Sequence, residues 1–183
     1  MLRIKFAISE FIFESCITER GIYSLHIIDR LDEYREFTLL DSSGTSNLEI
    51  SRHQQRLING ICIYLKHNRD IKEIIPDFSG YTDKEISIFK ALMNVPIGYV
   101  VTYSSLASYA LKNKANRYIG RTLSRNRLQL LVPCHRVVMK NRKIGGFTSP
   151  MGLKLKIYLL SKEGHIIRDN KIEDCKFYDF AKY

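Results

Sequence analysis

Short runs of Ile, Phe and Tyr, separated by polar residues and Gly, dominate the first 40 positions of the chain. Such runs are typical of β-strands that bury one face. Further on, apolar residues return every three or four positions up to about Leu65, which predicts an amphipathic helix that begins near Leu48. The pattern therefore predicts an α+β region of antiparallel strands and one helix, with strands at 2–8, 11–17, 21–28 and 36–40.

In the second half of the chain, apolar residues recur mainly at helical spacing instead of in short strand-like runs. Thr82 and Glu85 have the spacing of a capping box, and the helix that they begin ends by Pro96. Two short helical patterns then follow each other across Lys112-Asn113-Lys114, in the outline of a helix-turn-helix. A last helix ends before Gly164. These three later helices are expected at 103–111, 115–124 and 151–162.

The predicted fold class is α+β in two domains. A small N-terminal domain of antiparallel sheet and helix occupies 1–80, and a mostly helical domain containing the helix-turn-helix occupies 81–168, before a polar tail at 169–183. No run of 18 apolar residues and no secretory signal occur, so we expect no membrane partner. The expected location is intracellular, in the cytoplasm or, for a eukaryotic protein, the nucleus.

Positive charge is concentrated in the second half of the chain. The net charge is +10 overall, and fourteen Lys and Arg but no acid lie between Glu85 and Glu163. Arg117, Arg121 and Arg125 recur every four residues and therefore share one helix face. This face is either a solvated basic stripe or a surface that binds the phosphates of a nucleic acid.

One of four scattered cysteines has neighbours that point to chemistry. No CxxC pair occurs, and the sequence gives no sign of a metal site or a cofactor. Pro133-Cys134-His135-Arg136 places a thiol beside an imidazole and a guanidinium in an apolar run, where nearby positive charge would lower the thiol pKa. A papain-like hydrolase is disfavoured because only His165 follows at a distance. Glu163 is either the carboxylate that orients His135 or a solvent-exposed charge.

The segment Leu131-Val132-Pro133-Cys134-His135-Arg136-Val137-Val138 resembles the active-site signature of the O6-alkylguanine-DNA alkyltransferases. Pro96-Ile97-Gly98-Tyr99-Val100-Val101-Thr102-Tyr103, Asn116-Arg117-Tyr118-Ile119-Gly120, Asn126 and the Leu159–Gly164 ending resemble that family in order and spacing. The resemblance covers about 81–165. It implies a DNA repair protein that binds the minor groove, flips the damaged base out of the duplex and accepts its alkyl group in one suicidal turnover.

The resemblance also implies roles for individual residues. Cys134 would accept the alkyl group, His135 would activate it through a water with Glu163 as orienter, Tyr103 would donate to the leaving guanine, and Asn126 would brace the turn of Cys134. DNA contacts would come from Arg117, which replaces the flipped base, and from Arg121, Arg125, Tyr103, Thr102, Ala115, Asn116 and Gly120. The substrate pocket would involve Pro133, Val137, Phe147, Thr148 and Ser149.

The expected partner is double-stranded DNA carrying O6-alkylguanine, bound by a monomer without a cofactor. The chain departs from the family at Asn116 and Tyr118, where small residues are usual, and at Phe147, where Tyr is usual. The competing hypothesis is a non-enzymatic helix-turn-helix DNA-binding protein in which Cys134 is structural.

Overall fold

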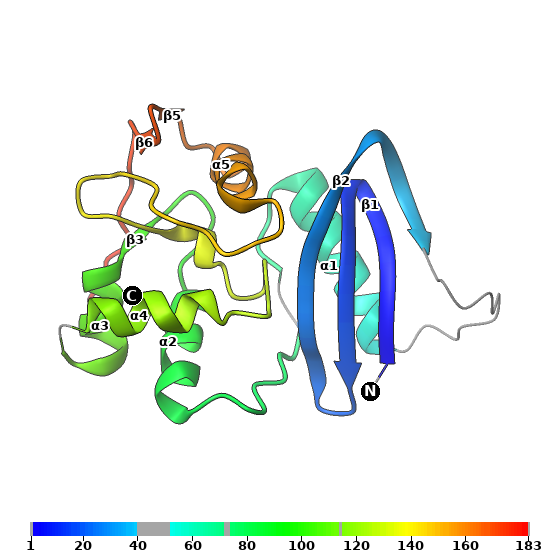
Figure 1. Ribbon diagram of the computed structural model, residues 1–183, viewed down its shortest axis with the longest axis horizontal. Helices are drawn as coiled ribbons and strands as arrows, with labels where there is room; N and C mark the ends of the chain where they lie inside the picture. Colours follow the sequence, from blue (N-terminus) through cyan, green and yellow to red (C-terminus); the bar gives the residue numbers. More distant parts are fainter. Residues whose placement is uncertain (1, 40–51, 72–73, 114, 183) are drawn as a thin grey trace. The chain divides into compact units, whose positions relative to one another are not determined.

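The computed structural model describes residues 2–39, 52–71, 74–113 and 115–182, which fall into two compact units (Figure 1). The first unit extends to Ser79 and includes Arg127–Leu131, and the second contains Gly80–Asn126 and the residues from Val132 onward. This division departs from the domains expected at 1–80, 81–168 and 169–183. The chain returns to the first unit at Arg127–Leu131, and the expected tail belongs to the second unit.

The first unit is built on one long antiparallel hairpin of β1 (Leu2–Thr18) and β2 (Gly21–Leu39). The expected separation of strands 2–8 and 11–17 is wrong. The polar pair Ser9-Glu10 predicted a break there, but β1 continues through it as one strand. The register shifts on both sides of Ser9, which has a φ of 55°, and the extra residues lie on β2, where Thr38 to Arg30 faces Ala7 to Phe11.

The second strand of the first unit is longer than expected, and its helix is described from Arg52. The expected strands 21–28 and 36–40 are one strand through Leu39. The polar run at 41–46, which predicts a loop, and residues 48–51 lie outside the described residues. Helix α1 (Arg52–His67) buries Leu57, Ile61 and Tyr64 and packs on β1 (Figure 1).

Two segments from elsewhere in the chain pair with β2. Ile22 pairs with the stretch that leads to Asp77. The amide of Leu25 donates to the carbonyl of Arg127 at 2.7 Å, and its carbonyl accepts from the amide of Gln129 at 2.9 Å. The Gln129 side chain also accepts from the amide of Ile27. This pairing covers strand edge that would otherwise leave backbone groups unsatisfied, and it explains why Arg127–Leu131 belongs to the first unit.

The second unit begins with three helices: α2 (Asp83–Met93), α3 (Tyr103–Leu111) and α4 (Asn116–Ser124). The predicted capping box of Thr82 and Glu85 is confirmed, and a second box joins Thr102 to Ser105 at the start of α3. Helix α3 ends where Lys112 adopts a left-handed conformation, with a φ of 57°. The bounds predicted for α3 are confirmed, whereas Ala115 precedes α4 as its N-cap instead of being its first residue.

Short strands connect these helices to the rest of the unit. Strand β3 (Val101–Thr102) pairs in parallel with β4 (Val137–Val138), which directly follows the 3-10 turn η1 (Cys134–Arg136). Helix α5 (Gly152–Lys162) contacts η1, and β5 (Ile167–Arg168) forms a hairpin with β6 (Lys171–Ile172). None of the helices in the described part of the chain has the length and hydropathy needed to span a bilayer.

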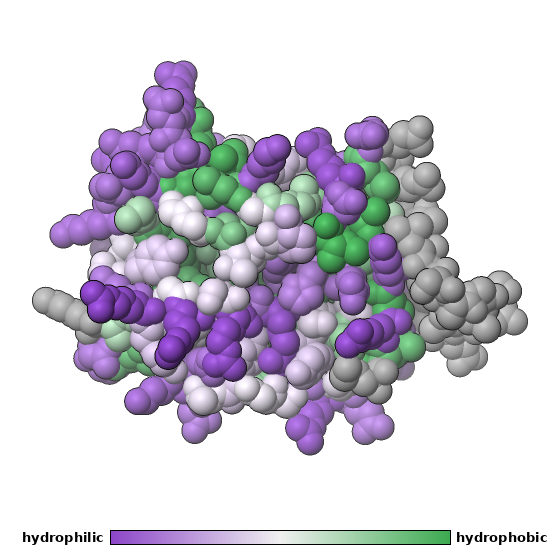
Figure 2. Space-filling model, viewed as in Figure 1, coloured by the Kyte–Doolittle hydropathy of each residue, from purple (hydrophilic) through white to green (hydrophobic). Residues whose placement is uncertain are grey.

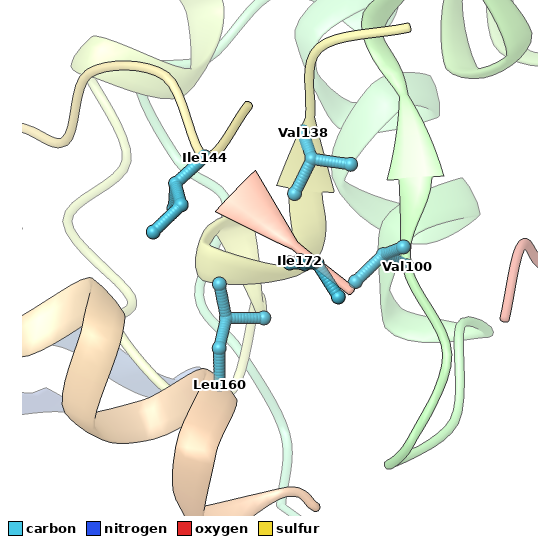
Figure 3. Close-up of a cluster of buried hydrophobic side chains, with 5 residues drawn as sticks. All are labelled: Val100, Val138, Ile144, Leu160 and Ile172. Atoms are coloured by element: carbon cyan, nitrogen blue, oxygen red, sulfur yellow. The ribbon is translucent and has the colours of Figure 1, made fainter. Parts of the chain in front are cut away.

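The expected polar tail is packed into the second unit. Ile172 is fully buried in a cluster with Val100, Val138, Ile144 and Leu160 (Figure 3). Val100 also donates to the carbonyl of Lys176 and accepts from the amide of Tyr178, at 2.9 and 2.8 Å. The tail therefore supplies both core and backbone pairing beside the segment that leads into α3.

Candidate active site

Cys134 begins the η1 turn and lies at the boundary between the core of the second unit and a cavity. The parallel pairing of β3 with β4 holds the turn close to the start of α3, which carries Tyr103. Asn126 fixes the thiol, because its side-chain amide donates to the carbonyl of Val132 at 3.0 Å and to Sγ of Cys134 at 3.1 Å. The structure thus brings Asn126 and Cys134 together.

Glu163 lies at the C-cap of α5 with its carboxylate fully buried against two side chains of η1. Nε2 of His135 is 2.8 Å from Oε1, and Arg136 donates from Nη2 to Oε1 at 2.8 Å and from Nε to Oε2 at 2.9 Å. Arg136 also donates to the carbonyl of Val95. Of the two alternatives for Glu163, the structure gives the buried partner of His135 and not an exposed charge.

The protonation of this pair follows from burial and charge. Burial opposes ionisation of Glu163, but the charges and hydrogen bonds of His135 and Arg136 outweigh it and lower its pKa to about 2. Burial also lowers the pKa of His135, so the ring is neutral near pH 7. Because an ionised carboxylate only accepts hydrogen bonds, Nε2 of His135 carries the ring proton and Nδ1 keeps the lone pair.

The expectation that nearby positive charge lowers the pKa of the Cys134 thiol is wrong for the net effect. Burial raises this pKa, and the hydrogen bond from Asn126 and the charge of Lys156 only partly oppose it. The main physical reason is that burial disfavours the charged thiolate, while the guanidinium of Arg136 donates to the carboxylate of Glu163. Cys134 is therefore a protonated thiol at rest, and forming the thiolate requires a proton acceptor.

Lys156 is a second buried cation near Cys134 besides Arg136, and it was not among the predicted site residues. It lies on α5 with only 1% of its surface exposed, and Nζ donates to the carbonyls of Val137 and Ile144 at 2.7 Å each. Burial lowers its pKa to about 8, although the charge of Cys134 raises it. A signal existed: Lys156 stands between Leu155 and Leu159 on the stripe where α5 is buried.

A cavity of about 230 Å³ opens beside the thiol. Its walls come from the start of α3, the second half of α4, η1 and the loop that follows Gly145. Burial, and then the nearby charge of Cys134, raise the pKa of Tyr103, so its hydroxyl remains a proton donor at neutral pH. The lining residues are Tyr103, Gly120, Leu123, Ser124, Cys134, Gly146, Phe147 and Thr148.

The structure separates the expected pocket residues into two groups. Phe147 and Thr148 line the cavity, whereas Pro133, Val137 and Ser149 do not belong to its lining. Pro133 and Val137 are buried in the turn that carries the thiol, and the Val137 carbonyl already accepts from Lys156. The hydroxyl of Ser149 is buried without a hydrogen-bond partner among the described residues.

The expected DNA-contacting residues occupy the outer face of α4 and the two helix starts. Arg117 and Arg121 are exposed, as is Asn116, and Gly120 faces the cavity. Arg125 is exposed too, but it forms an ion pair with the buried Glu85 at 2.6 Å. The hydroxyl of Thr102 is engaged in the cap of α3, and Ala115 provides no side-chain cap for α4.

Comparison with known proteins places the chain among DNA alkyltransferases. Residues 83–165 match the sequence family described as "6-O-methylguanine DNA methyltransferase, DNA binding domain". A methylated-DNA–protein-cysteine methyltransferase of Shigella flexneri is 31% identical over 150 residues, which are 82% of this chain and 80% of that protein. The protein of the same name from Saccharomyces cerevisiae is 44% identical over 82 residues, 45% of this chain but only 43% of the yeast protein. The chain likewise spans about half the length of most of the curated relatives that it matches.

The fold has solved counterparts. The structure of Mycobacterium tuberculosis OGT in complex with DNA superposes with a TM-score of 0.67 over 86% of this chain and 90% of that one, at 19% identity. The fold is thus the mixed α/β fold of the O6-methylguanine methyltransferase structures. On the strength of the Shigella relative, the chain belongs to the methylated-DNA–protein-cysteine methyltransferase family.

Proposed function

We propose that this protein repairs O6-alkylguanine in double-stranded DNA by transferring the alkyl group to its own Cys134 in a single irreversible turnover. The observation that carries the proposal is the cavity, because its walls include the thiol of Cys134, the phenol of Tyr103 and residues of α4. A nucleophile, a proton donor and the basic helix thereby meet at one opening. The membership of the family supports the same activity.

The proposed chemistry begins with the removal of the thiol proton. Nδ1 of neutral His135 accepts it through a water, and Glu163 stabilises the resulting imidazolium through its 2.8 Å contact with Nε2. The Lys156 ammonium stabilises the thiolate. Sγ of Cys134 then forms a bond to the alkyl carbon while the carbon–O6 bond breaks, and the electron pair passes to the guanine. Tyr103 donates a proton or hydrogen bond to the leaving ring.

The proposed DNA complex uses α3 and α4 as a helix-turn-helix with α4 in the minor groove. A buried thiol cannot reach O6 inside a duplex, so the base must be flipped, which costs a few kcal/mol. Arg117 would occupy the space that the base leaves, and Arg121 would bind phosphate. Figure 2 shows hydrophilic side chains gathered along α4, beside paler surface toward the loop that lines the cavity. The ion pair of Arg125 with Glu85 makes Arg125 a weaker phosphate ligand than Arg121.

A mass measurement of the intact protein tests the proposal. After incubation with a duplex that carries one O6-methylguanine, we expect the mass of one methyl group on Cys134 and no second turnover. Cys134→Ser should bind the duplex and gain no mass, and Cys175→Ser, which alters another free cysteine, should still be methylated. If the protein binds DNA but gains no methyl group, the non-enzymatic DNA-binding hypothesis replaces this one.

A further inference from the structure

A second basic surface lies in the same unit, outside the cavity and outside α4. It consists of two adjacent turns, at 139–144 and at 167–172, which we name the basic double turn. Three carboxylates lie in or next to it, Asp169, Glu173 and Asp174, and Asp174 accepts from the amide of Ile166 at 3.0 Å. Glu173 pairs with Arg168 at 3.6 Å. The five exposed cations of the double turn are Lys140, Arg142, Lys143, Arg168 and Lys171.

The two turns form one rigid platform. Lys143 pairs with Lys171 in an antiparallel bridge, and Ile144 and Ile172 donate to the carbonyls of Asn170 and Arg142 at 2.9 and 3.0 Å. Ile144 and Ile172 are both fully buried in the cluster of Figure 3. The cations are therefore carried on a fixed backbone, so binding a ligand there orders fewer groups than a mobile loop would.

The charge arrangement is unfavourable in the free protein. Like charges directly opposite each other in an antiparallel pair destabilise it, and Lys143 and Lys171 are such a pair. A polyanion would remove this repulsion. The platform is thus better suited to a bound polyanion than to solvent alone.

The platform adjoins the cavity through the loop that follows its first turn. One wall of the cavity is α4, at Gly120 and Leu123, and another is the loop 146–148, which follows the first turn of the platform directly. In Figure 2, hydrophilic atoms gather both along α4 and near β5 and β6, with pale and hydrophobic surface between them. A duplex that lies on α4 with its flipped base in the cavity would extend from α4 toward the platform.

We infer that the basic double turn binds the phosphates of DNA flanking the lesion, as a second contact that extends the footprint beyond α4. The inference rests on the proposed function for the position of the flipped base. The contact is to the sugar-phosphate backbone. The Lys and Arg side chains of the platform lie outside the cavity, and α4 already occupies the groove in which base edges are exposed. The contact is therefore independent of sequence and sensitive to salt.

Binding to duplexes of two lengths tests this inference. One duplex has about one helical turn, roughly 10 base pairs, and the other about three turns, roughly 30 base pairs, each with one central O6-methylguanine. The variant is K140Q/R142Q/K143Q, measured in a Cys134→Ser background so that no transfer intervenes. The matched control, R52Q/R56Q/K66Q, removes three cations from the exposed face of α1.

We expect the variant to bind the long duplex about 10-fold or more weakly than the parent, with the slope of log K against log salt less steep by about 0.9 for each lost phosphate contact. Its affinity for the short duplex and the affinities of the control should change by less than about threefold. R168Q/K171Q, on the second turn, should weaken binding to the long duplex in the same direction, which keeps the test valid if the first variant folds poorly.

Four results would overturn the inference. Equal losses on both duplexes, or equal losses in the control, would mean that the double turn makes no separate contact. A proportional fall in transfer from a free benzylated guanine, measured on the same three substitutions with Cys134 intact, would mean that the turn only shapes the adjacent cavity loop. Unchanged DNA binding with lost binding to polyglutamate would assign the surface to an acidic protein. Failure of the proposed function is seen separately, as absence of methyl mass on the parent protein.

Discussion

Replacing Glu163 with Gln is the sharpest test of the buried cluster. The substitution keeps the shape of the side chain and removes its charge. Arg136 is only 3% exposed and has its guanidinium directed to this carboxylate, so the variant leaves a buried cation without its counter-charge. His135 loses the charge that favours its protonated form. We therefore expect Glu163→Gln to affect stability as well as chemistry.

The expected loss of stability follows from two routes that agree. Lowering the pKa of Glu163 from 4.5 to about 2 corresponds to about 3 kcal/mol in favour of the folded state with the carboxylate ionised. Removing one partner of a buried ion pair costs about 3–5 kcal/mol in general. We predict that Glu163→Gln lowers the free energy of unfolding by about 3–5 kcal/mol near pH 7.

The pH dependence has a definite sign. The pKa of Glu163 is lower in the folded protein than in the unfolded chain, so its stabilising contribution is complete above about pH 4.5. It is lost progressively as the pH falls toward about 2, where the folded-state carboxylate is protonated as well. The stability difference between the parent and Glu163→Gln should therefore be largest near neutral pH and become smaller below pH 4.5.

Urea unfolding at a series of pH values measures this difference, and single-turnover methyl transfer measures the chemistry. Glu173→Gln is the matched control, since Glu173 is 44% exposed and its ion pair at 3.6 Å should contribute less than about 1 kcal/mol. Adding Arg136→Met to Glu163→Gln should recover part of the lost stability, because the unpaired cation is then gone. A loss below about 1 kcal/mol at pH 7, or a loss that does not vary with pH, would refute the reasoning.

Three further substitutions test the DNA face and the cavity. Arg117→Ala should slow repair of duplex DNA far more than transfer from free benzylated guanine, because only the duplex needs a residue to replace the flipped base; equal slowing would remove Arg117 from that role. Gly120→Ala should raise the free energy of unfolding by about 0.5–1 kcal/mol, since an added Cβ meets no atom within 4 Å, while slowing repair of bulky adducts in competition assays; faster repair of them would contradict the cavity assignment. Lys156→Met should raise the pKa of Cys134, seen as a higher midpoint in the pH profile of iodoacetamide alkylation, whereas the exposed Lys154→Met should not.

Helices with local signals were predicted well, and strands were not. The bounds of α3 follow from residues that contact one another within a single turn, such as Thr102 and Ser105. In β1 the local pattern misled, because the polar pair Ser9-Glu10 is compatible with either two strands or one continuous strand. Only the pairing with β2 decides between them, because it runs from Phe6 to Thr18 on both sides of Ser9.

No local pattern in the sequence predicts that Arg127–Leu131 belongs to the first unit. Leu128 is an apolar residue that could be buried in either unit, and its partner, Leu25, lies about a hundred positions earlier in the chain. The expected tail was misread for a similar reason. Its polar composition suggested loose docking, but a single Ile172 in the core and two backbone hydrogen bonds at Val100 hold it in place.

The sequence by itself determined the kind of protein and the identity of its reactive group. Cys134, His135 and Glu163 were singled out from residue type and order, and the basic segment pointed to a nucleic acid. What the tertiary structure decided is the electrostatics: it directs Arg136 to Glu163, buries Lys156 near the sulfur and raises the pKa of the thiol. These effects depend on burial and on the distance between charges from distant segments, which no stretch of sequence encodes locally.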